Sequence, residues 1–173
     1  MGSLRVDGAG VLLRRILVGV GLMLASLAAQ ASQADEYCLA LNIYYEARAE
    51  VEQGKFAVAY VTLNRSRYRK QSICHVVFDY KQFSWVEQYK VLDENKHVKP
   101  EFRPAAKDRA WIACKAIAKA ALAHPEGDFT RNAQFFVANY IMPGCLRSSC
   151  KWIYNLEFTG QYGRHMFFRL KKT

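Results

Sequence analysis

The strongest candidate for a chemical role is a glutamate, Glu46, in the apolar and aromatic stretch NIYYEARAE over residues 42–50. On a helix, Glu46 falls on the same side as Leu39, Ile43 and Glu50, so half of its neighbours on that side are apolar. Apolar neighbours desolvate a carboxyl group, which disfavours the ionised form and raises its pKa. Such a group keeps a proton near neutrality, as a general acid acting on a glycosidic oxygen must.

A structural role is the alternative for Glu46, and the local pattern alone favours it. Arg48, Lys55 and Arg65 are within reach along the chain, and an ion pair with any of them would stabilise a helix end. The pattern therefore identifies a candidate acid without deciding between catalysis and an ion pair.

A second catalytic carboxylate is not evident. Most glycosidases use two, one as acid and one as nucleophile or base. Glu50, Asp79 and Asp128 are available, but nothing in their sequence setting distinguishes any of them.

Three helices and a short β-rich end are expected to position these groups. The expected helices cover residues 35–48, Glu52 to Tyr68, and Ala105 to Ala123, the last opened by Pro104. A long irregular middle should separate the second helix from the third. The stretches AQFFVANYI and YGRHMFF predict strands near the C-terminus. The expected fold class is α+β, mainly α, in a single domain with a small β element.

The five cysteines indicate disulfides and an oxidising compartment. Cys145 and Cys150 flank the short turn LRSS and are the best candidates for a local bridge. Cys38 with Cys74 is the favoured second bridge, because Cys114 falls on the apolar stripe of the third expected helix and is predicted to be a free, buried core residue. The competing interpretation is a zinc site, but the chain has no C-x-x-C or H-x-x-x-H spacing, so we expect no metal or cofactor.

The N-terminal segment has the pattern of a secretory signal. Two arginines precede the uncharged run ILVGVGLMLASLAA, which is followed by the small-residue site Ala29-Gln30-Ala31. Cleavage is expected after residue 31, with a site after residue 34 as second choice, leaving residues 35–173 as the domain. An uncleaved anchor is the alternative, but the run is shorter than the roughly 20 residues that a spanning helix needs. The protein is therefore expected to be secreted or periplasmic, with transient membrane contact through this segment.

The net charge predicts an anionic partner. Removing residues 1–31 takes away three arginines and one aspartate, so the charge falls from +10 to +8. A basic exported protein is attracted to cell-wall polymers, anionic lipids or nucleic acid. Nucleic acid is the disfavoured choice, because the aromatic residues lie in apolar runs and not on a clustered basic face. About 140 residues suit one domain, and a monomer is expected.

The chain resembles the SleB-type cell-wall hydrolases, a family that includes spore-cortex lytic enzymes. The matching blocks are LALNIYYEARAE at 39–50, QGKFAVAYVTLNR at 53–65, CHVVFDYKQFSW at 74–85, DFTRNAQFF at 128–136 and YGRHMFF at 162–168. They follow the family's order and span nearly the whole expected mature chain.

This resemblance implies a lysozyme-like fold in which Glu46 is the catalytic acid. By the same match, Gln82, Phe83 and Ser84 would line the substrate groove, while Asn64 and Arg65 would support the helix pair. Further groove candidates are Phe136, as a sugar-stacking ring, and more weakly His165. The remaining aromatic residues near the matched blocks are expected to be mostly core.

The resemblance also implies an activity. A single carboxylate suits a lytic transglycosylase, which cleaves between N-acetylmuramic acid (MurNAc) and N-acetylglucosamine (GlcNAc) and closes a 1,6-anhydro ring. The alternatives are a non-catalytic wall-binding protein, or a muramidase or amidase acting as a phage endolysin.

Two segments depart from the family pattern. Arg131-Asn132 stands where relatives carry Gly-Gly, and PGCLRSSCKW replaces a proline-aromatic stretch.

Overall fold

The computed structural model describes residues 33–145 and 151–171 of the chain. The chain divides into two units, Met1–Ala34 and Asp35–Thr173, and the second holds nearly all of the described residues. None of the helices in the described residues combines the length and the apolar character needed to cross a membrane.

Three long helices form the helical part, close to where the sequence predicts them. They are the N-terminal helix, described over residues 33–47, then α2 (Glu52–Arg69) and α5 (Arg109–Ala123). Helix α2 ends at Lys70, whose left-handed backbone lets its N–H bond back to carbonyls of the last turn. Helix α5 begins later than expected because Asp108, and not Pro104, opens it. The Asp108 side chain accepts bonds from the N–H groups of Ala110 and Trp111.

The middle of the chain holds short helices that the sequence did not predict. They are α3 (Ile73–Phe78), α4 (Ser84–Gln88) and the 3₁₀ turn η1 (Pro100–Phe102). Ser72 caps α3 by accepting a bond from the N–H of His75. The expectation of an irregular middle was therefore wrong over α3 and α4, whereas the segment between α4 and α5 is mostly loop.

The C-terminal part contains a three-stranded antiparallel sheet in the order β1-β3-β2. Its strands are β1 (Phe135–Ala138), β2 (Leu156–Tyr162) and β3 (His165–Leu170). The remaining short elements are η2 (Pro125–Gly127), η3 (Asn139–Ile141), α6 (Met142–Cys145) and η4 (Lys151–Asn155). Both expected strands are present, while β2 was not predicted. The fold class, α+β and mainly α with a small sheet, is confirmed.

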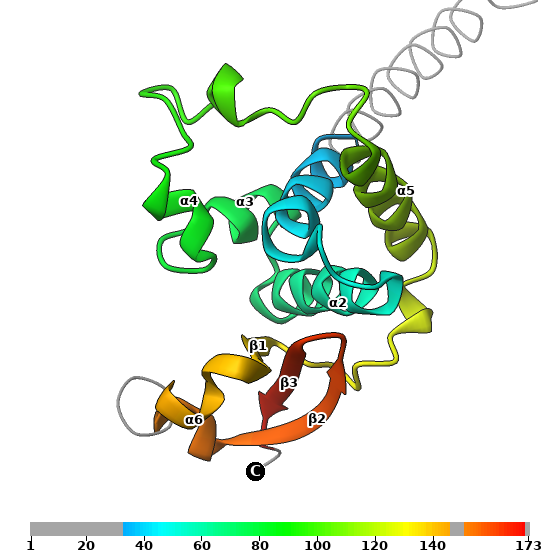
Figure 1. The fold of residues 1–173 in the computed structure, drawn as a ribbon, viewed down its shortest axis with the longest axis vertical. Coiled ribbons are helices and arrows are strands. Elements are labelled where there is room, and N and C mark those ends of the chain that lie inside the picture. The colour runs from blue at the N-terminus through cyan, green and yellow to red at the C-terminus, as the bar shows by residue number, and fades with distance from the viewer. Residues whose placement is uncertain (1–32, 146–150, 172–173) are drawn as a thin grey trace, which may run out of the picture. The chain divides into compact units, whose positions relative to one another are not determined.

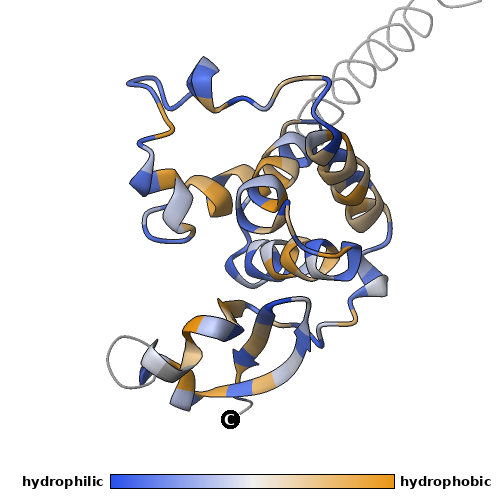
Figure 2. Cartoon of the chain, in the orientation of Figure 1, coloured by the Kyte–Doolittle hydropathy of each residue, from blue (hydrophilic) through white to orange (hydrophobic). Residues whose placement is uncertain are grey.

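Helix α2 is the central element of residues 35–173. Figure 1 shows the N-terminal helix, α3, α4 and α5 on one side of α2, and the sheet together with α6 on the other. Towards the helices, the core contains fully buried residues such as Leu39, Ile43 and Val76. Towards the sheet, Val58 and Val61 of α2 pack with Phe167 of β3, which is also fully buried. Figure 2 shows the apolar colour on the helices and the hydrophilic colour along much of the α4–α5 loop.

Cysteine pairing agrees with the prediction where the structure describes it. A disulfide joins Cys38 of the N-terminal helix to Cys74 of α3, across 36 residues of sequence. Cys114 is free and fully buried on α5, as predicted. The predicted bridge between Cys145 and Cys150 lies outside the described residues, because residues 146–150 are not described.

Candidate active site

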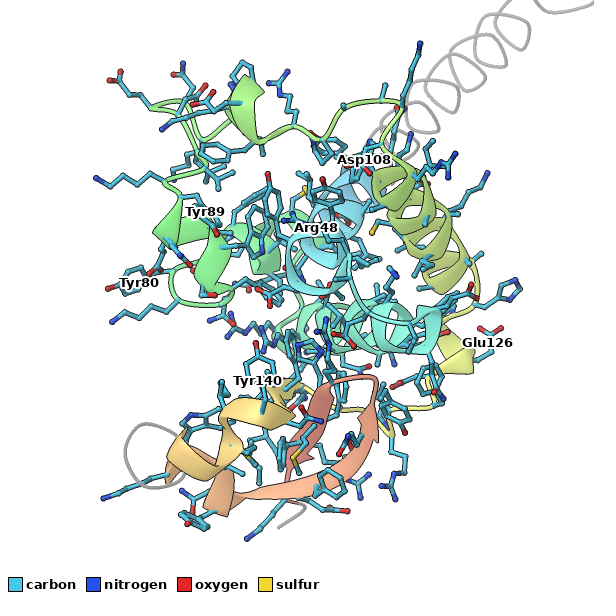
Figure 3. The ribbon with its side chains drawn as sticks, viewed as in Figure 1. Arg48, Tyr80, Tyr89, Asp108, Glu126 and Tyr140 are labelled. Carbon is cyan, nitrogen blue, oxygen red and sulfur yellow. A yellow bond between two sulfur atoms is a disulfide. The ribbon has the colours of Figure 1, made fainter. Side chains whose placement is uncertain are left out.

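Glu46 lies at the C-terminal end of the N-terminal helix, at the wall of an open cavity of about 360 Å³. The cavity lies between this helix end and the segment formed by α4 and η1. Its lining residues are Tyr45, Glu46, Arg48, Ser84, Trp85, Gln88, Tyr89 and Phe102. Figure 3 shows Arg48 at the helix end and Tyr89 on the side of α4. Glu46 is the only acidic side chain among these lining residues.

Burial raises the pKa of the Glu46 carboxyl to about 7, against an opposing effect of the positive charge on Arg65. The predicted apolar support is present, since Ile43 is fully buried one turn earlier and Leu39 two turns earlier. Glu46 therefore faces an open cavity, and its carboxyl group is about half protonated near neutral pH.

The ion-pair alternative finds no direct partner in the described part of the chain. The guanidinium of Arg48 lies 4.9 Å from the centre of the Tyr44 ring. The Lys55 ammonium donates to the backbone carbonyl of Glu50. Arg65 donates to backbone carbonyls, so it acts on Glu46 only through its charge.

A buried polar network holds the cavity wall in place. Asn42 is fully buried; its amide donates to the Thr62 hydroxyl at 3.0 Å, and its carbonyl accepts from the Trp85 indole N–H at 2.9 Å. Trp85 in turn stacks on Tyr45, with ring centres 4.4 Å apart. The Tyr45 hydroxyl donates to the carbonyl of Phe102 at 2.7 Å. The network thus connects the N-terminal helix, α2, α4 and η1 around Glu46.

Arg65 organises the segment that the sequence assigned to the groove. Its Nε donates to the carbonyl of Gln134 at 2.6 Å and its Nη1 to the carbonyl of Gln82 at 3.1 Å, while the guanidinium lies 4.7 Å from the centre of the Phe83 ring. Desolvation lowers its pKa to about 10, so it stays charged at neutral pH. The expected role in supporting a helix pair needs correction, because Arg65 joins α2 to two loop segments.

Asn64 likewise supports a loop and not the helix pair. Its amide donates to Asp128 Oδ2 and to the carbonyl of Ala133, both at 2.9 Å. The loop that it holds contains Arg131 and Asn132, whose φ angles of 58° and 62° are left-handed. Glycine adopts this conformation at no steric cost, so the Gly-Gly pair that the resemblance implies at these two positions would suit the same backbone.

The predicted groove residues separate into two cavities. Ser84 lines the cavity at Glu46, whereas Gln82 and Phe136 line a second cavity of about 500 Å³. Phe83, between them in sequence, is 3% exposed and belongs to the core. It packs near Phe136, with ring centres 6.5 Å apart. Phe83 therefore lines neither cavity, and its expected place in the groove needs correction to the core.

His165 lines neither of the two cavities. It is half-buried at the start of β3, and its ring meets Phe136 edge-on with centres 5.3 Å apart. Desolvation lowers its pKa, so the ring is neutral near neutrality. These contacts place His165 in the support of the sheet, which is the core role that a lone histidine between glycine and aromatic residues most often has.

The other candidate carboxylates all have structural partners. Glu50 is 8% exposed and accepts from the Arg164 side chain at 2.7 Å and from the Arg164 backbone N–H at 2.8 Å. It does not share a helix face with Glu46, because the helix ends at residue 47. Asp79 pairs with Arg69 at 2.9 Å. Asp128 accepts bonds within its own loop, including one from the N–H of Thr130 at 2.8 Å.

Within the described residues, no three or more His, Cys, Asp and Glu side chains form a group that could hold a metal ion.

The mainly helical domain with its small sheet, and the single acid among the residues that line the cavity at Glu46, agree with the lysozyme-like fold that the resemblance implies. The family model described as cell wall hydrolase matches residues 49–168, and the chain belongs to this family. The matched region begins just after Glu46.

Two solved structures share the fold. One is the catalytic domain of the germination-specific lytic transglycosylase SleB from Bacillus anthracis, which is 23% identical, with a TM-score of 0.57 over 79% of this chain and 95% of that chain. The other is the catalytic domain of the Bacillus cereus SleB protein, which is 21% identical, with a TM-score of 0.51 over 79% of this chain and 91% of that chain. No curated protein matches the chain.

The family and the Cys38–Cys74 disulfide together point to an enzyme that works outside the cytoplasm.

Proposed function

We propose that the protein is a lytic transglycosylase that cleaves peptidoglycan between MurNAc and GlcNAc, with Glu46 as its catalytic residue. One observation carries the proposal: Glu46 is the only acid lining its cavity, and its pKa is raised to about 7. Such a group gives up a proton and takes one back within a single turnover.

The reaction needs two proton transfers. Glu46 first gives its proton to the glycosidic oxygen, the bond from that oxygen to C1 of MurNAc breaks, and GlcNAc leaves with a new hydroxyl. The Glu46 carboxylate then takes the proton of the MurNAc C6 hydroxyl as O6 bonds to C1. This step closes the 1,6-anhydro ring without water and restores the protonated acid.

Arg65 assists the state between the two transfers. Its charge favours the carboxylate form of Glu46, which exists only after the glycosidic oxygen has been protonated. Arg65 has no direct bond to Glu46 among the described contacts, so it stabilises the carboxylate without removing the proton from the resting acid.

Hydrolysis with water is the less favoured chemistry because it normally uses a second carboxylate to activate the water. Glu50, Asp79 and Asp128 are each held by structural partners. The Bacillus anthracis relative, which shares the fold, is itself a lytic transglycosylase.

Analysis of the sugar products tests the proposal. Purified peptidoglycan is digested with the protein, and the products are examined by mass spectrometry with and without borohydride reduction. We expect 1,6-anhydromuropeptides, which are one water lighter than the hydrolytic products and resist reduction. Reducible MurNAc ends would instead indicate a muramidase, released stem peptides an amidase, and unchanged peptidoglycan a wall-binding protein.

We further propose that residues 1–31 form a secretory signal, that the exported protein is secreted or periplasmic, and that it acts as a monomer. The support is the basic, apolar and small-residue pattern of that segment. N-terminal sequencing of the exported protein is expected to begin at Ser32 or Asp35. Recovery of the intact chain in the membrane would mean a retained anchor.

A further inference from the structure

The second cavity, of about 500 Å³, has a different chemistry from the cavity at Glu46. It is lined by the C-terminal part of α2, by the segment at Lys81 and Gln82, and by residues of the sheet region. Three of its lining residues are cations, Arg65, Arg69 and Lys81, and none is acidic. The remaining lining residues are two glutamine amides and several apolar or aromatic side chains, among them Trp152.

The positive charge in this cavity is only partly neutralised by the protein. Arg69 pairs with Asp79 at 2.9 Å. The Lys81 ammonium, in contrast, lies 4.7 Å from the centre of the Tyr80 ring and has no carboxylate partner among the described contacts. Arg65 is held by two backbone carbonyls. Clustered cations that are only partly paired in a cavity attract an anionic ligand.

The basic cavity and the candidate active site have neighbouring linings. Gln82 lines the basic cavity, Ser84 lines the cavity at Glu46, and the buried Phe83 lies between them in sequence. Arg65 belongs to the basic cavity, and its charge acts on Glu46. The two linings therefore come within two residues of each other, a short distance for a polymeric substrate to extend across.

We propose that the basic cavity binds the carboxylate groups of the peptide stems of peptidoglycan, so that cleavage depends on the charge of the stems. This inference rests on the proposed function. In a strand that carries peptides, the lactyl carboxyl of MurNAc is bound as an amide to the stem, so the anionic groups are the carboxylates of the stems. The stems are attached to MurNAc, the sugar whose bond is cleaved. The glutamine amides suit the peptide groups of a stem, and the rings suit its aliphatic parts.

A comparison of two substrates and three proteins tests the proposal. The substrates are peptidoglycan freed of phosphate-containing polymers, and the same material after its carboxylates are converted to amides with carbodiimide and ammonia. The proteins are full-length wild type, Lys81→Gln, and the control Lys119→Gln, which removes the same charge from an exposed position on α5. We expect amidation to lower the kcat/KM of wild type and of Lys119→Gln by about 10-fold, the size of a lost charged hydrogen bond. For Lys81→Gln the loss on amidation should shrink to a few-fold.

A binding arm keeps this test separate from the proposed activity. Full-length Glu46→Gln, and the same protein with either Lys81→Gln or Lys119→Gln added, are each mixed with the native or the amidated material, and the bound fraction is measured by pelleting at low and at high salt. We expect tighter binding to the native material, with a difference that salt reduces and that Lys81→Gln, but not Lys119→Gln, makes smaller. If wild type cleaves neither substrate, the proposed function fails, and the binding arm still decides the role of the cavity.

Equal binding to both materials, together with equal cleavage where cleavage occurs, would overturn the proposal. The proposal would also be overturned if Lys119→Gln became as insensitive to amidation as Lys81→Gln. That result would assign the effect to the net charge of the protein and not to the cavity.

Discussion

Glu46 owes its properties to the balance between burial and one nearby charge. Burial disfavours the carboxylate, while Arg65 favours it, and burial has the larger effect. The direction of this shift follows from the sequence, since Leu39 and Ile43 are spaced to lie beneath Glu46. The absence of a direct ion-pair partner does not follow, because it depends on where Arg48, Lys55 and Arg65 find their own contacts.

The activity should fall as pH rises through about 7, because the first proton transfer needs protonated Glu46. The measurement is a profile of kcat/KM against pH at constant ionic strength, because kcat/KM reports the pKa of the group in the free enzyme. A descending limb near pH 7 agrees with the account. A rate that stays constant to about pH 9 would show that the acid is a different group.

The stability should follow the same group. The folded protein keeps a proton at Glu46 up to about pH 7, whereas an unfolded chain releases it near the ordinary value of 4.5. The free energy of unfolding of wild type should therefore fall, relative to that of Glu46→Gln, as pH rises between these values. Urea unfolding of both proteins at about pH 5 and about pH 8 measures the difference, and an unchanged difference would contradict the burial of Glu46.

Asn42 shows what sequence reasoning missed at the residue scale. It stands in the same stretch as Glu46, and a polar residue at a predicted buried position is the signal that was available. Its partners, Thr62 and Trp85, are 20 and 43 residues away, and no local pattern pairs them. The sequence therefore supplied the candidate acid, whereas the polar network that holds its cavity is a tertiary feature.

At the scale of elements, the long helices were predictable and the short ones were not. The N-terminal helix, α2 and α5 each carry enough turns for an apolar period to be visible. Helices α3 and α4 have only 6 and 5 residues, too few for such a period. Strand β2 contains Gly160, and its pairing with β3 shifts register between Phe158 and Gly160. Buried and exposed residues do not alternate along β2, so its sequence lacks the two-residue repeat that identifies a strand.

The turn between β2 and β3 is held by Glu50, which joins the sheet to the segment after the N-terminal helix. Gly163 in this turn has a φ of +59°, and a Cβ there would lie 2.2 Å from Glu50 Oε2. Gly163→Ala should therefore disrupt the bonds of Glu50 to Arg164 and destabilise the protein by at least about 1–2 kcal/mol from backbone strain alone.

Gly144→Ala is the matched control, because a Cβ at Gly144 meets no atom within 4 Å. Urea unfolding of the two variants gives the comparison. A Gly163→Ala protein as stable as Gly144→Ala would show that the turn adapts and that Glu50 is not essential to it.

At the scale of the whole molecule, a single disulfide links the N-terminal helix to α3 across 36 residues. Cross-linking a loop of this length stabilises a protein by about 2–4 kcal/mol, chiefly by restricting the unfolded chain. The double variant Cys38→Ser, Cys74→Ser should lose about this much free energy of unfolding. Cys114→Ser, which alters the free buried thiol, is the comparison, and it should leave the bridge intact in a non-reducing peptide map. A peptide map of wild type that placed Cys114 in a disulfide would contradict the structure.

The fold as a whole places one acid, Glu46, beside an open cavity. The other candidate carboxylates, Glu50, Asp79 and Asp128, are each bonded to structural partners. Glu46→Gln tests this central claim most directly. The amide keeps the shape of the side chain but neither donates nor retakes the proton, so 1,6-anhydromuropeptide release should fall by about 10² to 10⁴-fold. The melting temperature, measured on the same preparation, should be at least that of wild type. A variant with lowered melting temperature and full release of anhydro products from its folded fraction would show that Glu46 is a structural residue.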